Sequence, residues 1–320
     1  MALLQITAAT ADMDEASQRV GGLKRAANRQ FRLTDVSAAY LLLAPVLVLF
    51  AVAVVYPLVD TIALSFYDIT GLAPASFVGL GNYQQLFADP EFQQVLLTTL
   101  IWTITTTVLS VSIGWALALV CALAPAETLI PRALIFSAFG ISEVVTGSIW
   151  AGIFRADSGG LLNSIFTSVG LGALAHPWLG DSNTALWCII LAYSWAGVGL
   201  PLMMIFAAAQ AVPRSTLEAA YIDGARPLSV MLHIIAPLSL PGVRVALFIN
   251  LLGSLKAFDI IYVLTGGGPT RSTETVGYFM YRESFTQSKF GYGAAATMVL
   301  LAAVLIVSIP AILRRTADAR

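Results

Sequence analysis

Six stretches of this chain are long and apolar enough to cross a lipid bilayer, and no other feature limits its fold as strongly. A spanning helix needs about 20 predominantly apolar residues. Continuous apolar runs of that length are typical of membrane helices. The chain is therefore expected to be an all-α membrane protein with six transmembrane helices, over residues 37–59, 95–123, 133–154, 182–213, 243–264 and 292–313.

The composition agrees with this class and excludes others. Hydrophobic residues make up 58% of the 320 residues, and Asp, Glu, Lys and Arg only 11%, against roughly a quarter in an ordinary soluble domain. The net charge of −1 gives no electrostatic basis for binding nucleic acid. Two cysteines and two histidines form no pattern of metal ligands or of a disulfide framework. A disordered chain, a disulfide-stapled secreted module and a typical cytosolic enzyme are excluded.

Basic residues predict how the chain crosses the membrane, because cytoplasmic loops carry the excess of Lys and Arg. Twelve lie before the first stretch, between the second and third, between the fourth and fifth, and after the sixth, whereas four lie in the opposite loops. Both termini are therefore expected in the cytoplasm. This divides the chain into a cytoplasmic N-terminal segment over 1–36, a transmembrane domain over 37–314 and a cytoplasmic tail over 315–320. The two long outer loops, 60–94 and 155–183, are expected to hold short helices.

The segment between the fourth and fifth stretches, about residues 212–241, is too long for a plain connection between helices. Ser215 or Thr216 can cap a helix there. Gly224 is suited to end that helix, and a second short helix can start after Pro227. The pattern predicts an elbow of two helices on the cytoplasmic face. The alternative is an interfacial helix that lies on the lipid headgroups.

Three ionisable side chains lie inside the predicted spans: Glu143, Lys256 and Asp259. Such groups are expensive in a membrane and usually face a cavity or a partner. Lys256 and Asp259 are three residues apart, so a continuous helix places them on one face, where they either neutralise each other or line a polar path. Glu143 either faces this path or hydrogen-bonds a neighbouring helix. Polar and aromatic groups suit the hydroxyls and the apolar face of a sugar, and the further side chains that fit are Asn250, Ser254, Tyr262 and Tyr278.

Four motifs occur in order along the chain. The first lies within 77–90, in the first outer loop, and the second is Glu218-Ala219-Ala220 followed by Gly224 and Ile234. The third is 258–269, which ends in Gly-Gly-Gly-Pro, and the fourth lies within 278–296. The second motif resembles the EAA motif of ABC-importer permeases, although Ala236-Pro237 stands where that motif has Leu-Pro. Taken together, the four resemble the carbohydrate-uptake branch of these permeases, in particular the F-type subunit of maltose importers and the A-type subunit of glycerol-phosphate importers.

The resemblance implies the fold of a type I ABC importer permease, in which the elbow is a coupling helix that docks on a cytoplasmic ATPase. The residues that it assigns to this contact are Glu218, Ala219, Ala220, Asp223, Gly224 and Arg226. The chain has no Gly-x-x-x-x-Gly-Lys-Ser/Thr loop. ATP and Mg are therefore expected on partner subunits, with no catalytic residue, metal or cofactor on this chain. The implied partners are a second permease subunit, two ATPase subunits and an extracytoplasmic substrate-binding protein, in the bacterial cytoplasmic (inner) membrane.

The expected function is that of a permease subunit in an ATP-driven importer, forming half of the pathway for an oligosaccharide or a related sugar. Lys256 keeps open the alternative of an importer for glycerol-3-phosphate or glycerophosphodiesters, because a cation in the path attracts an anionic substrate. The alternative of a different class is a secondary transporter. Such a protein would carry an inverted repeat and broken helices near the midplane, and the sequence shows no clear repeat.

Overall fold

The computed structural model describes residues 33–157 and 159–318, so most of the predicted N-terminal segment and the last two residues of the predicted tail lie outside it. The chain divides into two compact units, residues 1–60 and 61–320. In the first unit, α2 (Leu33–Phe50) passes through a π-helical turn, Ala51–Val55, into α3 (Tyr56–Leu64), whose last residues belong to the second unit. The apolar helix Tyr40–Leu64 is long enough to cross a membrane.

In the second unit, two further helices are long and apolar enough to cross a membrane by themselves. These are α5 (Pro90–Leu123) and the apolar part of α17 (Phe290–Asp318). Three helix pairs pass the same test only when each bent pair is taken as one span. The prediction of six spans is thus confirmed over the described residues, but the expectation that the third, fourth and fifth are continuous helices is wrong.

The third span breaks sharply where Glu143 was expected to lie in mid-helix. α6 (Leu129–Phe139) and α7 (Glu143–Ile153) meet at an angle of 99°. Ser142 has an extended backbone, and its hydroxyl accepts a hydrogen bond from the Val145 N–H at 3.3 Å. A serine in this conformation starts a new helix. Glu143 is therefore the first residue of α7, at the break itself.

The fourth span bends by 42° between α9 (Ala185–Gly197) and α10 (Gly199–Gln210). Pro201 has no N–H for the carbonyl of Gly197, which weakens the helix at this point. At Gly199 a Cβ would lie 2.9 Å from the Cα of Phe136. The glycine therefore lets α10 approach α6 more closely than any other residue would allow.

The fifth span starts earlier and ends earlier than predicted. The second helix of the elbow comprises α12 (Pro227–Val230), a π-helical turn, Met231–Ile235, and α13 (Ala236–Leu238). After Ser239 it bends by 60° into α14 (Leu240–Leu255). A new short helix, α15 (Asp259–Leu264), follows after three residues. Lys256 and Asp259 therefore do not share one helix, and no ion pair joins these two described residues.

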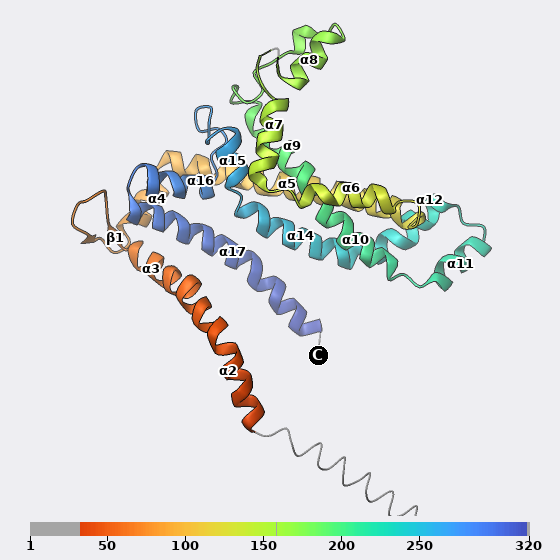
Figure 1. Cartoon of the computed structure of the whole chain (residues 1–320), viewed down its shortest axis with the longest axis horizontal. Coiled ribbons are helices and arrows are strands. Elements are labelled where there is room, and N and C mark those ends of the chain that lie inside the picture. The colour runs from red at the N-terminus through yellow and green to blue at the C-terminus, as the bar shows by residue number, and fades with distance from the viewer. Residues whose placement is uncertain (1–32, 158, 319–320) are drawn as a thin grey trace, which may run out of the picture. The chain divides into compact units, whose positions relative to one another are not determined.

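The centre of the second unit is built from α5, α10 and α14, which contact one another in all three pairings (Figure 1). At Gly114 of α5, a Cβ would lie 2.7 Å from Cβ of Pro201 and 2.9 Å from the backbone nitrogen of Leu202. Two buried polar contacts join α5 to α14. Nε1 of Trp102 donates to the carbonyl of Ser254 at 3.1 Å, and the hydroxyls of Thr107 and Ser254 lie 3.3 Å apart. The third span contributes by packing α6 against α10 and α7 against α15.

The outer loops contain the short elements that the sequence predicts, together with a two-stranded ribbon. β1 (Tyr67–Asp68) pairs antiparallel with β2 (Ser76–Phe77), and α4 (Gly81–Ala88) follows. The second loop holds α8 (Leu161–Ser168) and a 3₁₀ turn, Gly172–Leu174. The third contains α16 (Val276–Tyr281) and a π-helical turn, Arg282–Thr286.

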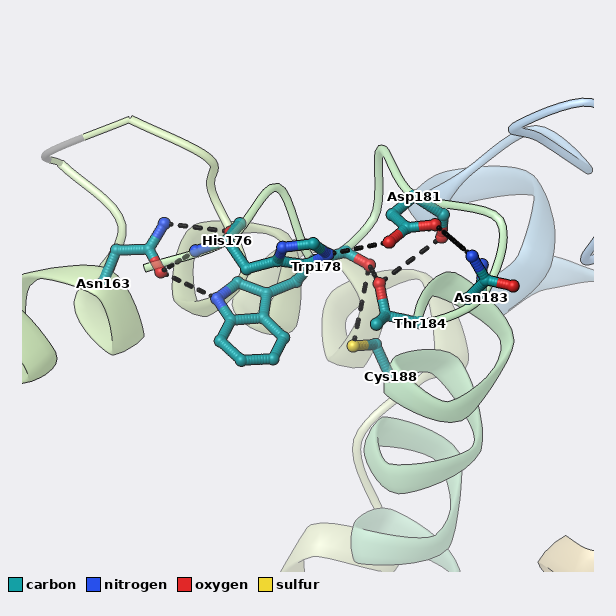
Figure 2. Close-up of polar contacts among 7 residues, drawn as sticks. All are labelled: Asn163, His176, Trp178, Asp181, Asn183, Thr184 and Cys188. Carbon is teal, nitrogen blue, oxygen red and sulfur yellow. Dashed lines mark hydrogen bonds and ion pairs between the residues drawn. The ribbon is translucent and has the colours of Figure 1, made fainter. Parts of the chain in front are cut away.

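One asparagine organises the second outer loop, as Figure 2 shows. Oδ1 of Asn163 accepts from Nε1 of Trp178 at 2.8 Å and from the backbone N–H of His176 at 3.1 Å. Nε2 of His176 lies 2.9 Å from a carboxylate oxygen of Asp181. The Asn183 N–H and the His176 ring hold the pKa of Asp181 below its usual value. The side chains of Asn163, His176, Trp178 and Asp181 thus fix the loop.

Candidate functional site

Three of the helix breaks lie around one cavity of about 400 Å³. The breaks are those between α6 and α7, between α9 and α10, and between α14 and α15. Irregular backbone at membrane depth is tolerated where it is buried in protein or lines a water-filled cavity. The convergence of three breaks on one cavity makes it the candidate site. Its walls are formed by Phe139, Ile141, Glu143, Thr146, Tyr193, Ala196, Gly197, Leu200, Ile249, Asn250, Gly253, Lys256 and Ile260.

The structure brings three of the predicted path residues together on these walls: Glu143 from α7, Asn250 from α14 and Lys256 from the end of α14. Asn250 donates one amide hydrogen to the carbonyl of Ala246 at 3.0 Å, and its side-chain oxygen has no hydrogen-bond partner among the described residues. Lys256 is exposed and forms no ion pair with any described carboxylate. The cavity thus holds an acid, an amide and a cation.

Sequence reasoning missed two polar residues of the cavity, Thr146 and Tyr193. The Thr146 side chain is 1% exposed, and its hydroxyl has no hydrogen-bond partner in the described chain. Thr146 lies three residues after Glu143, so the spacing of one helical face would have identified it once the start of α7 was known. Tyr193 gives no such signal, because it lies in an uninterrupted apolar run.

The other predicted path residues lie outside the cavity walls. Ser254 is 2% exposed, and its hydroxyl lies 3.3 Å from that of Thr107, so it joins α14 to α5. Asp259 and Tyr262 are exposed, and Tyr278 is half-buried. Ser254 therefore has a packing role, whereas Asp259 and Tyr262 remain accessible next to the cavity.

The elbow forms as predicted, with one correction. Its first helix, α11 (Arg214–Ile222), begins after Pro213, so Ser215 and Thr216 lie in the first turn and do not cap it. At its end the N–H of Ala225 bonds to the carbonyl of Ala220 at 2.9 Å, and that of Gly224 bonds to the carbonyl of Tyr221 at 3.1 Å.

These two hydrogen bonds form a Schellman motif, in which the residue after the helix takes a left-handed backbone conformation. Gly224 has a φ of +82° and fulfils this requirement. The expectation that Gly224 ends the helix is confirmed.

The two faces of the elbow differ in exposure. Leu217, Ala220 and Ala225 pack against a buried apolar cluster that includes Leu119 and Val230. The opposite face is exposed and combines charged and apolar side chains: Glu218, Ala219, Tyr221, Ile222, Asp223 and Arg226. The most exposed apolar side chain of this face is Ile222, with 86% of its surface accessible. Five of the six residues assigned to the coupling contact are therefore accessible, and Ala220 is half-buried.

A network of charges ties α5 to the third outer loop, which sequence reasoning did not foresee. Arg282 contacts Glu91, pairs with Glu274 at 2.8 Å and with Glu283 at 3.1 Å. Arg271 contacts the other oxygen of Glu91. Burial raises the pKa of Glu274, which is 1% exposed, and Arg282 opposes this shift. Glu91 and Arg282 are 191 residues apart in the sequence, so no local pattern predicts the link between α5 and the loop.

Within the part of the chain that the structure describes, no group of three or more His, Cys, Asp or Glu side chains could hold a metal ion. Cys121 and Cys188 are both buried free thiols.

Comparison with known proteins identifies the class. The family model described as binding-protein-dependent transport system inner membrane component matches residues 132–318. A probable ABC transporter permease protein of Pyrococcus horikoshii is 35% identical over 280 residues, covering 87% of this chain and 96% of that protein. The arabinooligosaccharides transport system permease protein of Bacillus subtilis is 32% identical over 276 residues, covering 85% of this chain and 87% of that protein.

The fold is shared with a chain of a bacterial alginate ABC transporter, solved in complex with an alginate pentasaccharide-bound periplasmic protein. The TM-score is 0.72 at 19% identity, over 87% of this chain and 93% of that chain. The chain therefore belongs to the family of inner membrane components of binding-protein-dependent transport systems.

Proposed function

We propose that this chain is one of two permease subunits in an ATP-driven importer of carbohydrates, and that the cavity is its part of the pathway. The observation that carries the proposal is the convergence of three helix breaks on one cavity that holds an acid, an amide and a cation, in a chain of this family. The arabinooligosaccharide relative supports a sugar as the substrate class.

The chemistry of the walls fits a polyhydroxylated ligand. Asn250, Thr146 and Tyr193 offer amide and hydroxyl groups that both donate and accept hydrogen bonds, and Glu143 adds a carboxyl group. Phe139 and three isoleucines provide apolar surface for the C–H face of a sugar ring. The volume of about 400 Å³ lies within the usual range of small-ligand sites.

The elbow is the proposed contact with an ATPase subunit, on which ATP and Mg bind. Its exposed face presents Ile222 as an apolar knob and Glu218 as a carboxylate for a basic partner group. Glu218→Ala should weaken binding of the ATPase or uncouple ATP hydrolysis from uptake, while membrane insertion survives. Glu127→Ala, at an exposed position outside the elbow, is the matched control for the loss of one carboxylate. Unchanged coupling in Glu218→Ala would count against this contact.

The remaining partners follow from the family. The second permease subunit and an extracytoplasmic binding protein complete the proposed importer, as the alginate transporter supports by its complex with a periplasmic protein. The excess of basic residues supports cytoplasmic termini. Broken helices also suit a secondary transporter, but the family match places this chain in a binding-protein-dependent system instead.

A second substrate class, glycerol-3-phosphate or a glycerophosphodiester, is favoured by one observation. Lys256 reaches the cavity without a carboxylate partner among the described residues, and such a cation attracts a phosphate group. Glu143 on the same wall opposes this attraction.

Uptake by the complete complex in vesicles separates the two classes, with neutral oligosaccharides and glycerol-3-phosphate as substrates. We expect ATP-dependent sugar uptake that Asn250→Ala lowers and Lys256→Gln preserves. The exposed loop residue Asn183, changed to alanine, is the control for Asn250. Phosphate-ester uptake that Lys256→Gln abolishes would instead establish the second class. Uptake that is independent of ATP would refute both.

A further inference from the structure

A continuous row of aromatic rings runs from the end of the cavity-lining segment into the third outer loop. Phe258 stacks on Tyr262, with ring centroids 5.5 Å apart and planes at 29°. Tyr281 contacts both of these rings, with centroids 5.0 Å from Phe258 and 5.6 Å from Tyr262. Phe285 extends the row beyond Tyr281 at 5.6 Å. The row therefore joins α15 to α16 and the turn that follows it.

Packing of the core accounts for only part of this row. None of the four rings belongs to a buried apolar cluster among the described residues, and three of them reach one only through Tyr278. Tyr262 is 50% exposed and Phe285 is 71% exposed. A contiguous group of accessible ring faces offers a surface on which a ligand can stack.

The position of the row connects it to the cavity. Phe258 lies between Lys256 and Ile260, which both line the cavity wall. Asp259 and Tyr262 are three residues apart in α15, so they lie on one face of that helix, and both are exposed, as is Lys256. Accessible side chains therefore occur along the chain from the cavity-lining Lys256 to the rings.

The chemistry of the row selects a carbohydrate over an anion. A ring face accepts the apolar C–H face of a pyranose, and the tyrosine hydroxyls can bond to sugar hydroxyls. Arg282, next to Tyr281, is already paired with Glu274 and Glu283 and contacts Glu91. The nearest guanidinium is therefore neutralised and gives the row little attraction for phosphate.

We propose that Phe258, Tyr262, Tyr281 and Phe285 form a second carbohydrate-binding subsite, which holds the sugar units that extend beyond the cavity toward the outer face. This inference rests on the proposed function as a carbohydrate importer. It makes the row a determinant of chain length, because a short sugar occupies the cavity alone and a longer one also stacks on the rings.

The test is uptake of a disaccharide and of a longer oligosaccharide of the same sugar by the complete importer in vesicles, each delivered on its binding protein. Tyr281→Ala and Phe285→Ala should each lower the preference for the longer sugar by about threefold to tenfold, the range expected for one aromatic contact. Disaccharide uptake should stay unchanged, and Tyr281→Phe should keep most of the preference. Phe77→Ala is the matched control, since that ring is 70% exposed and lies outside the row.

The outcomes that overturn the inference are distinct from failure of the proposed function. Equal loss for both sugars, accompanied by weaker binding of the binding protein or by loss of the second permease subunit, would make the row a protein contact. Unchanged uptake in both alanine variants would leave the rings as lipid-facing residues. If the wild-type importer transports no carbohydrate, the proposed function itself fails.

Discussion

Substitution of Gly224 isolates the geometry of the elbow from its surface chemistry. Gly224 has a φ of +82°, and a Cβ added there would meet no atom within 4 Å. Alanine at this position is therefore penalised only by its backbone conformation, at about 1–2 kcal/mol. A penalty of that size lowers the population of the native elbow relative to distorted ones by about fivefold to thirtyfold. Asparagine tolerates the left-handed conformation, so its penalty is much smaller.

The assay compares Gly224→Ala with Gly224→Asn in the complete importer reconstituted in vesicles. The readouts are substrate transported per ATP hydrolysed and the amount of ATPase subunit that co-purifies with the membrane subunits. We expect Gly224→Ala to lower at least one of these by several-fold, up to the population ratio above, while Gly224→Asn stays close to wild type. Membrane insertion should be unaffected in both variants, because Gly224 lies before the fifth span, which begins at Pro227.

Two results would refute this reasoning. If asparagine is as harmful as alanine, the defect comes from a side chain that blocks the partner surface and not from the backbone. If neither substitution changes coupling, the Schellman motif at Gly224 has no part in communication with the ATPase. A defect in alanine that is relieved by asparagine is the only outcome that the geometry predicts.

Three further predictions concern packing, the buried charges and the path. Gly114→Ala should lower the free energy of unfolding of the purified protein by about 1–3 kcal/mol, because the new Cβ would lie 2.7 Å from Cβ of Pro201. Gly152→Ala is the control and should be neutral or slightly stabilising, because a Cβ there would have no atom within 4 Å. Thermal unfolding measures both. Arg282→Ala should destabilise the protein by about 3–5 kcal/mol, because it leaves the buried Glu274 carboxylate without its main partner. Burial holds the folded-state pKa of Glu274 above its unfolded value, so its contribution to stability is present at low pH and is lost as the pH rises through the folded-state pKa. Glu274→Gln should remove that part of the pH dependence of thermal unfolding. Asp259→Ala should lower uptake more than assembly of the importer, whereas equal loss of both, measured by transport and by co-purification, would show that Asp259 only packs.

The sequence located five of the six spans and displaced the fifth toward the C-terminus. The location succeeds because the apolar length of a span is a property of composition and needs no knowledge of its neighbours. The sequence could not show that three of them bend, because a continuous helix and a broken helix have the same apolar composition. The cues were present as single residues: Ser142 caps α7, and Pro201 removes a hydrogen bond at the bend of the fourth span. Recognising them as breaks requires the packing that makes a bend favourable.

The sequence predicts correctly those path residues whose position depends on their own helix. It fails for residues whose position depends on contacts with distant parts of the chain. Glu143, Asn250 and Lys256 reach one cavity, as expected of polar groups at membrane depth. Placing Lys256 and Asp259 on one face required a continuous helix, whereas α14 ends at Leu255, before both residues. Ser254 was assigned to the path, but Trp102 and Thr107, about 150 residues earlier in the chain, hold it in the interior. Contacts between residues so far apart in the sequence do not appear in its hydrophobic periodicity.

The elbow and the cavity are joined by the same two helices, which gives the proposed coupling a mechanical basis. α10 runs from the cavity wall at Leu200 to the start of the elbow, and α14 runs from the end of the elbow back to the wall at Gly253. At the elbow end the two helices touch closely, since a Cβ at Gly242 would lie 2.7 Å from that of Ala208. Close-packed helices do not slide independently without opening voids. A displacement of the elbow should therefore move both helices together, so that the change of shape falls on the breaks at Val198 and at 256–258, which lie beside the cavity itself.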